Sequence, residues 1–262
     1  MGAAVKNDYF ATYSNVALAG SGKKGVLRQL DNGYYEIIIG AFAAFGNGGW
    51  VYDEATAKRY IESDREFLAE LQGGRMYSEW GHPVRLPGQS DAEWFARICS
   101  ILETNTSSHI RRIHLSYNTV VDERGRKVVA IIGEVRPAGY KADEFRLMLD
   151  NPDADVAYSI RSFARKDFQR SIKHITKIIT WDSVTTPGIA VATKYKTPSL
   201  ESKSVTETLD RVEQEFNLSR LRNSVIEPCN DVSFENMPHV KILTSLYEEH
   251  ARSIQVPSTF AW

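Results

Sequence analysis

A serine lies in the short apolar segment Asp155–Ser162, which reads DVAYSIRS, and its hydroxyl could act as a nucleophile. A serine hydroxyl is a poor nucleophile until a neighbouring base takes its proton. The segment lacks the Gly-x-Ser-x-Gly pattern of a hydrolase nucleophile elbow. Ser159 is therefore either an ordinary strand hydroxyl or an attacking group, and the rest of the chain has to decide between the two.

Histidine is the most frequent base in such chemistry because its side chain titrates near neutral pH. The six histidines of the chain are His82, His109, His114, His174, His239 and His250. His82 lies in the segment SEWGHPV, where the preceding glycine and the following proline restrict the backbone and present the ring on a loop. A turn histidine is still more often structural than catalytic, so both interpretations stay open at this point.

Metal chemistry is disfavoured by the residue pattern. His109 and His114 are an odd number of residues apart, so on one strand they face opposite sides. Cys99 and Cys229 are the two cysteines, and there is no His-Glu-x-x-His segment that would indicate zinc. We therefore expect no metal and no other cofactor. Two cysteines are also too few for a disulfide framework, which favours a reducing compartment.

The composition is that of an ordinary globular protein, with 262 residues and 42% hydrophobic side chains. A formal net charge of -1 argues against a broad electrostatic surface for nucleic acid. No apolar run approaches the roughly 20 residues that span a bilayer. We expect neither direct nucleic-acid binding nor a membrane segment.

Strands and short helices alternate irregularly along the chain. Predicted strands are 34–42, 156–164 and 174–184, with a hairpin over 109–135; predicted helices are 54–72 (N-cap Asp53), 91–102 and 141–150. This order disfavours a parallel doubly wound sheet and favours an α+β fold, with an antiparallel barrel or sheet and peripheral helices.

Three regions follow from the composition along the chain. Residues 1–30 are rich in Gly, Ser, Ala and Lys and are predicted to be a loosely ordered extension. Residues 31–198 form the main domain. Residues 199–262 are predicted to be a helical tail, in which Ser204 and Glu207 form a capping box before an amphipathic helix or helix pair.

Several segments, taken in order, resemble the prohead core protein proteases of tailed bacteriophages. They are NGGWVYDEATAKRYI, SEWGHPV, SSHIRRIHL, VVAIIGEVRPAGYKADEFRLML, VAYSIRSF and ITWDSVTTPG, and they cover roughly residues 45–190. Each motif alone is weak, and the order makes the set moderately specific. The resemblance implies a serine protease domain over 31–198 with a herpesvirus-protease-like fold, an antiparallel β-barrel surrounded by helices.

The resemblance also implies a catalytic triad of His82 as general base, Ser159 as nucleophile and Asp182 as the group that orients the histidine. An anionic Asp182 bound to the other ring nitrogen would fix the tautomer and stabilise the imidazolium. Herpesvirus-type proteases use a second histidine in that place, so His174, which has the same parity on the same strand, is the rival. The segment WDSVTTP matches the phage pattern and favours Asp182.

Two departures from the family pattern concern turns. The Gly-Glu that precedes the histidine in the family reads Ser78-Glu79-Trp80-Gly81 here, and the glycine after Ser-x-Arg is Ser162. Arg161 shares the face of Ser159 on a regular strand, and its functional interpretation is oxyanion stabilisation or attraction of an acidic substrate side chain. His109 is expected to be structural or to support the site.

Members of the resembled family cleave scaffold or core proteins and capsid proteins after glutamate, inside the assembling prohead in the host cytoplasm. The chain itself contains SLE at Ser199–Glu201 and SFE at Ser233–Glu235. An exposed linker is where cleavage is sterically possible, so we expect a precursor that removes its own tail after Glu201 or Glu235. Phage scaffold and major capsid proteins are the implied partners, together with a homo-oligomer, a dimer or a ring.

Two alternatives remain from the sequence. One is a non-enzymatic component of capsid assembly that keeps the fold. The other is a histidine-dependent metal nuclease, for which Arg111 and Arg112 offer thin phosphate-binding support. Treatment with a chelator and substitution of Ser159 are two tests that would distinguish these alternatives from a serine protease.

Overall fold

The computed structural model describes residues 10–16, 22–44, 46, 49–122, 125–205, 211–225 and 237–255, and these form an α+β fold. Its strands are β1 (Phe10–Val16), β2 (Gly22–Leu27), β3 (Tyr35–Phe42), β4 (Val51–Tyr52), β5 (Tyr77–Glu79), β6 (Thr106–Val121), β7 (Lys127–Pro137), β8 (Ala157–Asp167), β9 (Ile172–Val184), β10 (Leu200–Val205) and β11 (Arg211–Asn217). Its α-helices are α1 (Glu54–Ser63), α2 (Arg65–Gln72), α3 (Asp91–Cys99), α4 (Ala142–Asp150), α5 (Leu218–Val225) and α6 (Pro238–Gln255).

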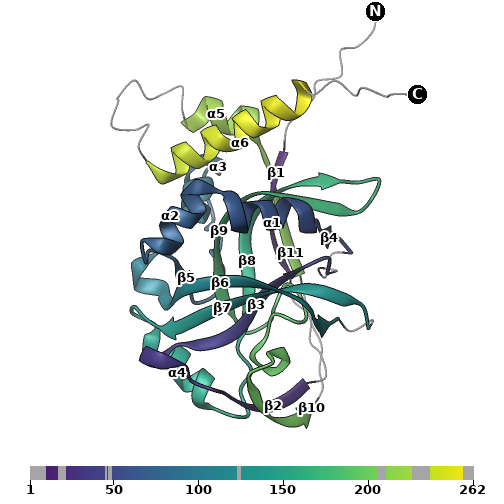
Figure 1. Ribbon diagram of the computed structural model, residues 1–262. Helices are drawn as coiled ribbons and strands as arrows, with labels where there is room; N and C mark the ends of the chain where they lie inside the picture. Colours follow the sequence, from purple (N-terminus) through teal and green to yellow (C-terminus); the bar gives the residue numbers. More distant parts are fainter. Residues whose placement is uncertain are drawn as a thin grey trace, which may run out of the picture.

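Two curved sheets carry the fold. One has the order β11-β1-β8-β9-β4 and the other β3-β7-β6-β5, while β10 and β2 form a separate pair. The strands pair antiparallel except at β4, which runs parallel to β9. Trp80, directly after β5, forms a parallel bridge to Ser183 of β9, so the two sheets meet at this point. Figure 1 shows β3, β6 and β7 crossing over β8 and β9.

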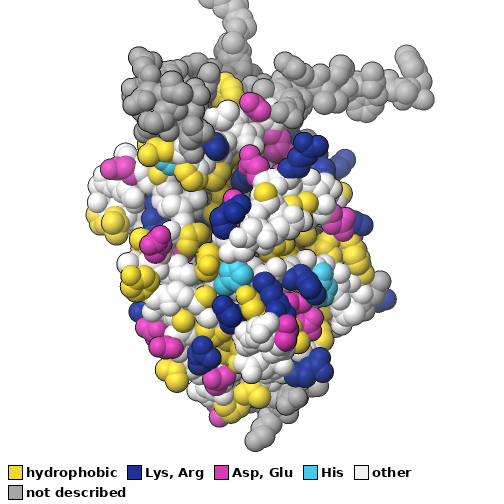
Figure 2. Space-filling model, turned by 60° about the vertical axis from the view of Figure 1, so that its left-hand side comes forward, with side chains coloured by type: hydrophobic (Ala, Val, Ile, Leu, Met, Phe, Trp, Pro, Cys, Tyr) yellow, Lys and Arg dark blue, Asp and Glu magenta, His cyan; other side chains and the backbone are white. Residues whose placement is uncertain are grey.

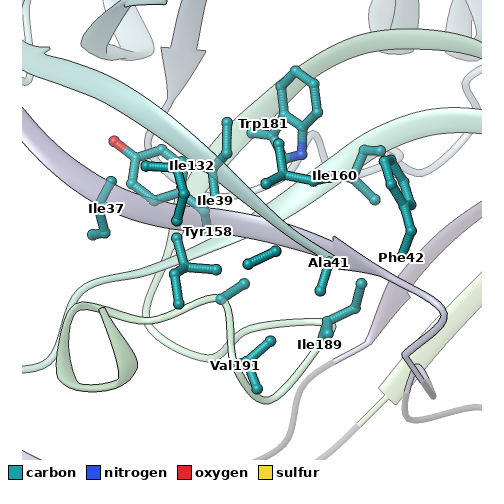
Figure 3. Close-up of a cluster of buried hydrophobic side chains, with 14 of the residues drawn as sticks. Ile37, Ile39, Ala41, Phe42, Ile132, Tyr158, Ile160, Trp181, Ile189 and Val191 are labelled. Carbon is teal, nitrogen blue, oxygen red and sulfur yellow. The ribbon is translucent and has the colours of Figure 1, made fainter. Parts of the chain in front are cut away.

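The main hydrophobic core lies between the two sheets. Figure 3 shows Ile37, Ile39 and Ala41 of β3 facing Tyr158 and Ile160 of β8 and Trp181 of β9. All of these side chains are buried. Because successive residues of a strand point to opposite faces, the core uses every second residue of β8 and leaves Ser159 and Arg161 on the other face.

A second apolar cluster holds the helices α3, α5 and α6 against that other face. Trp94, Phe95 and Ile98 of α3 pack with Phe163 of β8 and with Leu243 of α6. In Figure 1 these three helices lie together at the end of the molecule opposite to α4. The helix α3 is thus fixed between the strand β8 and the C-terminal helix.

Most predicted elements of the central region are confirmed. The hairpin is β6 and β7, the two long strands are β8 and β9, and the two short helices are α3 and α4. The helix predicted over 54–72 is two helices. Asp64 breaks it, because its carboxylate accepts a hydrogen bond from the Phe67 backbone N–H at 2.8 Å and so begins α2.

The structure corrects both ends of the predicted organisation. Residues 10–16 and 22–27, which we expected to be loosely ordered, are the strands β1 and β2, and β1 pairs with β8 and β11. The tail begins with the strands β10 and β11 before its helices. Val212 and Phe216 are four residues apart, a spacing that fits one face of a helix and one face of a strand equally well. Ser204 lies in β10, and Glu207 is outside the described residues.

Charged side chains of both signs are interspersed with apolar ones over the face shown in Figure 2, in keeping with the small net charge. Among the described residues, no helix is long and apolar enough to cross a membrane.

Candidate active site

Ser159 and Asp182 face each other across two neighbouring strands. They are directly opposite in the antiparallel pairing of β8 with β9. Directly opposite residues of such a pair project to the same face, with Cβ atoms about 4.5–5.5 Å apart. Both residues are buried, with Ser159 at 5% and Asp182 at 0% exposure. The pairing register therefore brings the candidate nucleophile and a carboxylate to one place.

The loop after β5 brings His82 to the same place. Gly81 has φ +77°, a left-handed conformation that glycine adopts without steric cost. Its N–H donates to the Ser183 carbonyl at 2.7 Å, and the Trp80 N–H donates to the Asn105 carbonyl at 2.9 Å. These two bonds attach the histidine loop to β9 on one side and to the start of β6 on the other.

His82 and Asp182 are hydrogen-bonded although they are 100 residues apart in the chain. The distance from His82 Nδ1 to Asp182 Oδ2 is 2.8 Å, and both side chains are at most 1% exposed. Asp182 Oδ1 also accepts the Glu79 backbone N–H at 3.1 Å. A carboxylate on Nδ1 leaves Nε2 as the ring nitrogen that can exchange a proton with a substrate or a hydroxyl.

Asp182 is held as an anion by its surroundings. Burial by itself would raise the pKa of the Asp182 carboxyl, but the Arg161 charge and the hydrogen bonds from His82 and Arg161 outweigh it and lower the pKa below its usual value. Arg161 Nε donates to Asp182 Oδ2 at 2.8 Å and Arg161 Nη2 to Asp182 Oδ1 at 2.6 Å. The fork fixes the plane of the carboxylate.

Arg161 is in turn held by other partners. Its Nη2 lies 3.0 Å from Glu79 Oε1, and its Nη1 donates to the carbonyls of Ile98 at 3.3 Å and Ser100 at 2.8 Å. The guanidinium is fully buried. The expectation that Arg161 binds an oxyanion or a substrate carboxylate is corrected by these contacts, because its five N–H groups are already directed at oxygens of the protein.

Comparisons with known proteins give the family of this chain. The model of the Peptidase S80 family matches residues 13–244, a range that contains His82, Ser159 and Asp182. The chain belongs to the Peptidase S80 family. Over 189 residues it is 31% identical to the capsid maturation protease of Pseudomonas phage phiKZ. This alignment covers 71% of this chain and 69% of that protein. A structure of the bacteriophage T4 capsid assembly protease aligns over 66% of this chain and 98% of its own, at 14% identity and a TM-score of 0.39.

His174, the rival for the third member of the candidate triad, lies elsewhere in this S80 family chain. His174, near the start of β9, contacts Asp53 through its Nδ1, 3.2 Å from Oδ2. Asp53 is the N-cap residue of α1, and its carboxylate accepts the Thr56 N–H at 3.0 Å. The structure brings Asp182, and not His174, to the ring of His82.

His109, in the resembling segment SSHIRRIHL, has structural partners. His109 Nδ1 is 2.8 Å from the Tyr34 hydroxyl, and its Nε2 is 3.0 Å from the Gly74 carbonyl. Burial lowers its pKa, so the neutral ring is favoured. Within the described part of the chain, no group of three or more His, Cys, Asp or Glu side chains is arranged to hold a metal ion.

The two candidate cleavage sites differ in what the structure describes. Glu201 lies in β10, opposite Val26 of β2, so it is part of a paired strand and not of an open linker. Glu235 lies outside the described residues.

The sequence alone did not indicate the residues behind the triad. Glu79 is a displaced member of a motif, and no sequence pattern singles out Arg97 or Asn105. Arg97 binds both carboxylate oxygens of Glu79, through Nη1 at 2.9 Å and through Nη2, and Asn105 Nδ2 donates to Oε2 at 3.2 Å. The one available signal is Glu79 itself, which is an acidic residue three positions before His82 and is fully buried at the end of β5.

Proposed function

We propose that this S80 family chain is a serine endopeptidase in which Ser159 is the nucleophile, His82 the general base and Asp182 the residue that orients His82. The observation that carries the proposal is the 2.8 Å contact between His82 Nδ1 and an Asp182 that lies directly opposite Ser159. His82 and Asp182, which are 100 residues apart in the chain, are in contact, and the strand pairing sets Ser159 opposite Asp182.

The chemistry follows from the roles of these groups. The Ser159 oxygen attacks the peptide carbonyl while His82 Nε2 takes its proton, and Asp182 stabilises the imidazolium that forms. The imidazolium then gives that proton to the leaving amine. Water repeats the sequence on the acyl-enzyme, releases the acid and restores the hydroxyl of Ser159.

The biological role comes from the relatives. Because the phiKZ relative is named a capsid maturation protease, we propose that this chain cleaves phage scaffold or core proteins and capsid proteins, after glutamate, inside the assembling prohead in the host cytoplasm. We also propose that the chain folds as a β-barrel of the herpesvirus-protease type and assembles as a dimer or a ring.

The test is incubation of the purified chain with its cognate scaffold protein and with a peptide that contains a single glutamate. We expect cleavage by the wild type and by Ser162→Ala, and a loss of at least about 10³-fold in Ser159→Ala. Ser162 is a suitable control because it is a second buried serine on the same strand. Full activity of Ser159→Ala would refute the nucleophile, and proteolysis that a chelator abolishes would contradict a metal-free serine mechanism.

Self-processing is a separate part of the proposal. Cleavage after Glu201 requires β10 to separate from β2 first, because a protease binds its substrate as an extended, unpaired segment. Mass spectrometry of the wild type, Glu201→Gln, Glu235→Gln and Ser159→Ala should show tail loss that depends on Ser159 and on one of the two glutamates. Equal truncation of all four proteins would exclude self-processing at these sites.

A further inference from the structure

A series of four charged side chains, linked by ion pairs, begins at Asp182 of the candidate triad. Asp182 contacts Arg161, Arg161 contacts Glu79, and Glu79 contacts Arg97. Three of these four side chains are fully buried, and Arg97 is 22% exposed. Burying an ion pair with so little water contact costs free energy unless its hydrogen bonds are satisfied. Packing alone therefore does not account for this arrangement.

Glu79 is fixed as firmly as Arg161. Besides the two contacts from Arg97, its Oε1 accepts the Leu102 backbone N–H at 3.0 Å. Burial alone would raise the pKa of the Glu79 carboxyl, but the hydrogen bond from Arg97 and the charge of Arg161 outweigh it and lower the pKa. Glu79 is therefore an anion at neutral pH on the far side of Arg161.

The charge of Glu79 changes what Asp182 can do for His82. A carboxylate paired with a guanidinium alone is close to neutral and attracts an imidazolium weakly. Because Glu79 shares Arg161, part of the negative charge of Asp182 remains available to His82. With Arg97 included, two anions balance two cations while His82 is neutral.

We propose that Glu79 and Arg161 are positioning residues of the protease, which set the plane and the effective charge of Asp182 and so the stability of protonated His82. This inference rests on the proposed function. Neither residue is expected to touch the substrate. In this series Arg97 pairs with Glu79, and it influences Asp182 and Arg161 through that ion pair.

The charged and titratable groups around Asp182 come from four elements. They are His82 on its loop, Glu79 in β5, Arg97 in α3, and Arg161 and Tyr158 in β8. Removing a negative charge from this set should make protonated His82 less stable, and removing a positive charge should make it more stable. The two kinds of substitution therefore have opposite expected signs.

The first experiment is the pH profile of kcat/KM. In Glu79→Gln the acid limb should move to lower pH by about one unit, and in Arg97→Gln it should move to higher pH. Arg161→Lys keeps the charge and loses the fork, so we expect a 10–100-fold lower kcat with little movement of the limb. Arg75→Gln, which removes one partner of an exposed ion pair with Glu70, is the matched control and should leave the profile unchanged.

A second readout does not need proteolysis. The imidazole ¹⁵N signals of His82 can be titrated by NMR in Ser159→Ala, alone and combined with Glu79→Gln or Arg97→Gln. Opposite displacements of the titration by the two substitutions support the inference. Coincident titrations in all folded variants, with activity lost only in proportion to folded protein, would overturn it and leave Glu79 and Arg161 as structural residues.

The two proposals can fail separately. Undiminished proteolysis by Ser159→Ala would refute the proposed function, while displaced His82 titrations would still show the electrostatic coupling. Conversely, proteolysis that requires Ser159 together with unmoved titrations would leave the protease intact and remove the role of Glu79 and Arg161. Arg97 is the safest site for folding, since its side chain is partly exposed.

Discussion

The backbone of one residue determines where the His82 ring lies. Gly81 has φ +77°, and a Cβ at this position would meet no heavy atom within 4 Å. The cost of any other residue at this position is therefore conformational and not a clash. Since the Gly81 N–H also bonds to Ser183, a change of its φ would move His82 relative to Asp182.

Gly81→Ala tests this directly. A left-handed conformation costs an L-residue about 1–2 kcal/mol, so we expect a stability loss of that size and a lower kcat. Gly81→Asn should lose less of both, because asparagine adopts this conformation more readily. Urea unfolding and peptide cleavage measure the two effects. Equal losses for Ala and Asn would count against the backbone argument.

Asp182→Asn tests the orienting carboxylate. The amide cannot stabilise an imidazolium and can hold the ring in the wrong tautomer, so kcat should fall about 10³–10⁴-fold. Stability should also fall, by about 3–5 kcal/mol, because Arg161 loses its buried partner. Asp91→Asn, at an exposed ion pair with Arg85, is the control and should change neither quantity appreciably. Rates are compared per folded molecule, as judged by circular dichroism.

At the scale of elements, α3 links the C-terminal helix α6 to β8 and to the residues around Asp182. One end of α3 supplies the carbonyl of Ile98 to Arg161, and its Arg97 binds Glu79. Its apolar face packs with α6 through Leu243. Loss of α6 would therefore loosen the support of Asp182 as well as uncover an apolar surface.

Leu243→Ala is expected to weaken this link. A fully buried leucine replaced by alanine costs about 2–5 kcal/mol, and the cavity would lie between α6 and α3. Leu147→Ala, at a side chain that is 71% exposed on α4, should cost less than about 0.5 kcal/mol. Denaturant unfolding gives both values. Similar losses in the two variants would contradict the packing that we describe.

At the scale of the whole molecule, the buried carboxylates give the stability two opposing pH dependences. Glu79 and Asp182 have lowered pKa values in the folded state, so their contribution is present above about pH 4 and is lost as the pH falls below that. Asp155 behaves in the opposite way. Burial raises its pKa to about 6, although its carboxylate accepts the Val156 N–H at 2.9 Å.

Asp155→Asn should therefore change the pH dependence of unfolding. Between about pH 4 and 6 the folded wild type keeps a proton that the unfolded chain has released, so its stability decreases as the pH rises through this range. Asparagine removes this slope and should raise the free energy of unfolding at pH 7 by about 1–3 kcal/mol. Asp153→Asn, two residues away and exposed, is the control. A slope that persists in Asp155→Asn would refute the assignment.

The sequence by itself determined the local structure of the centre of the chain, and its resemblance to the phage proteases supplied the candidate triad. Alternation in VAYSIRSF and ITWDSV is enough to predict two strands and to place Ser159 and Arg161 on one face, since strand side chains alternate strictly. The glycine and proline around His82 indicated a constrained loop, which the structure has.

Only the tertiary structure decided which groups meet. Strand parity does not choose between Asp182 and His174, because both positions share parity on β9, and the contact of Asp182 with His82 depends on the bridge of Trp80 to Ser183 that joins the sheets. The same is true of Arg161, whose burial depends on α3 covering the outer face of β8. Pairing register and helix docking are long-range properties, and a sequence period shows which face a residue occupies but not what lies against that face.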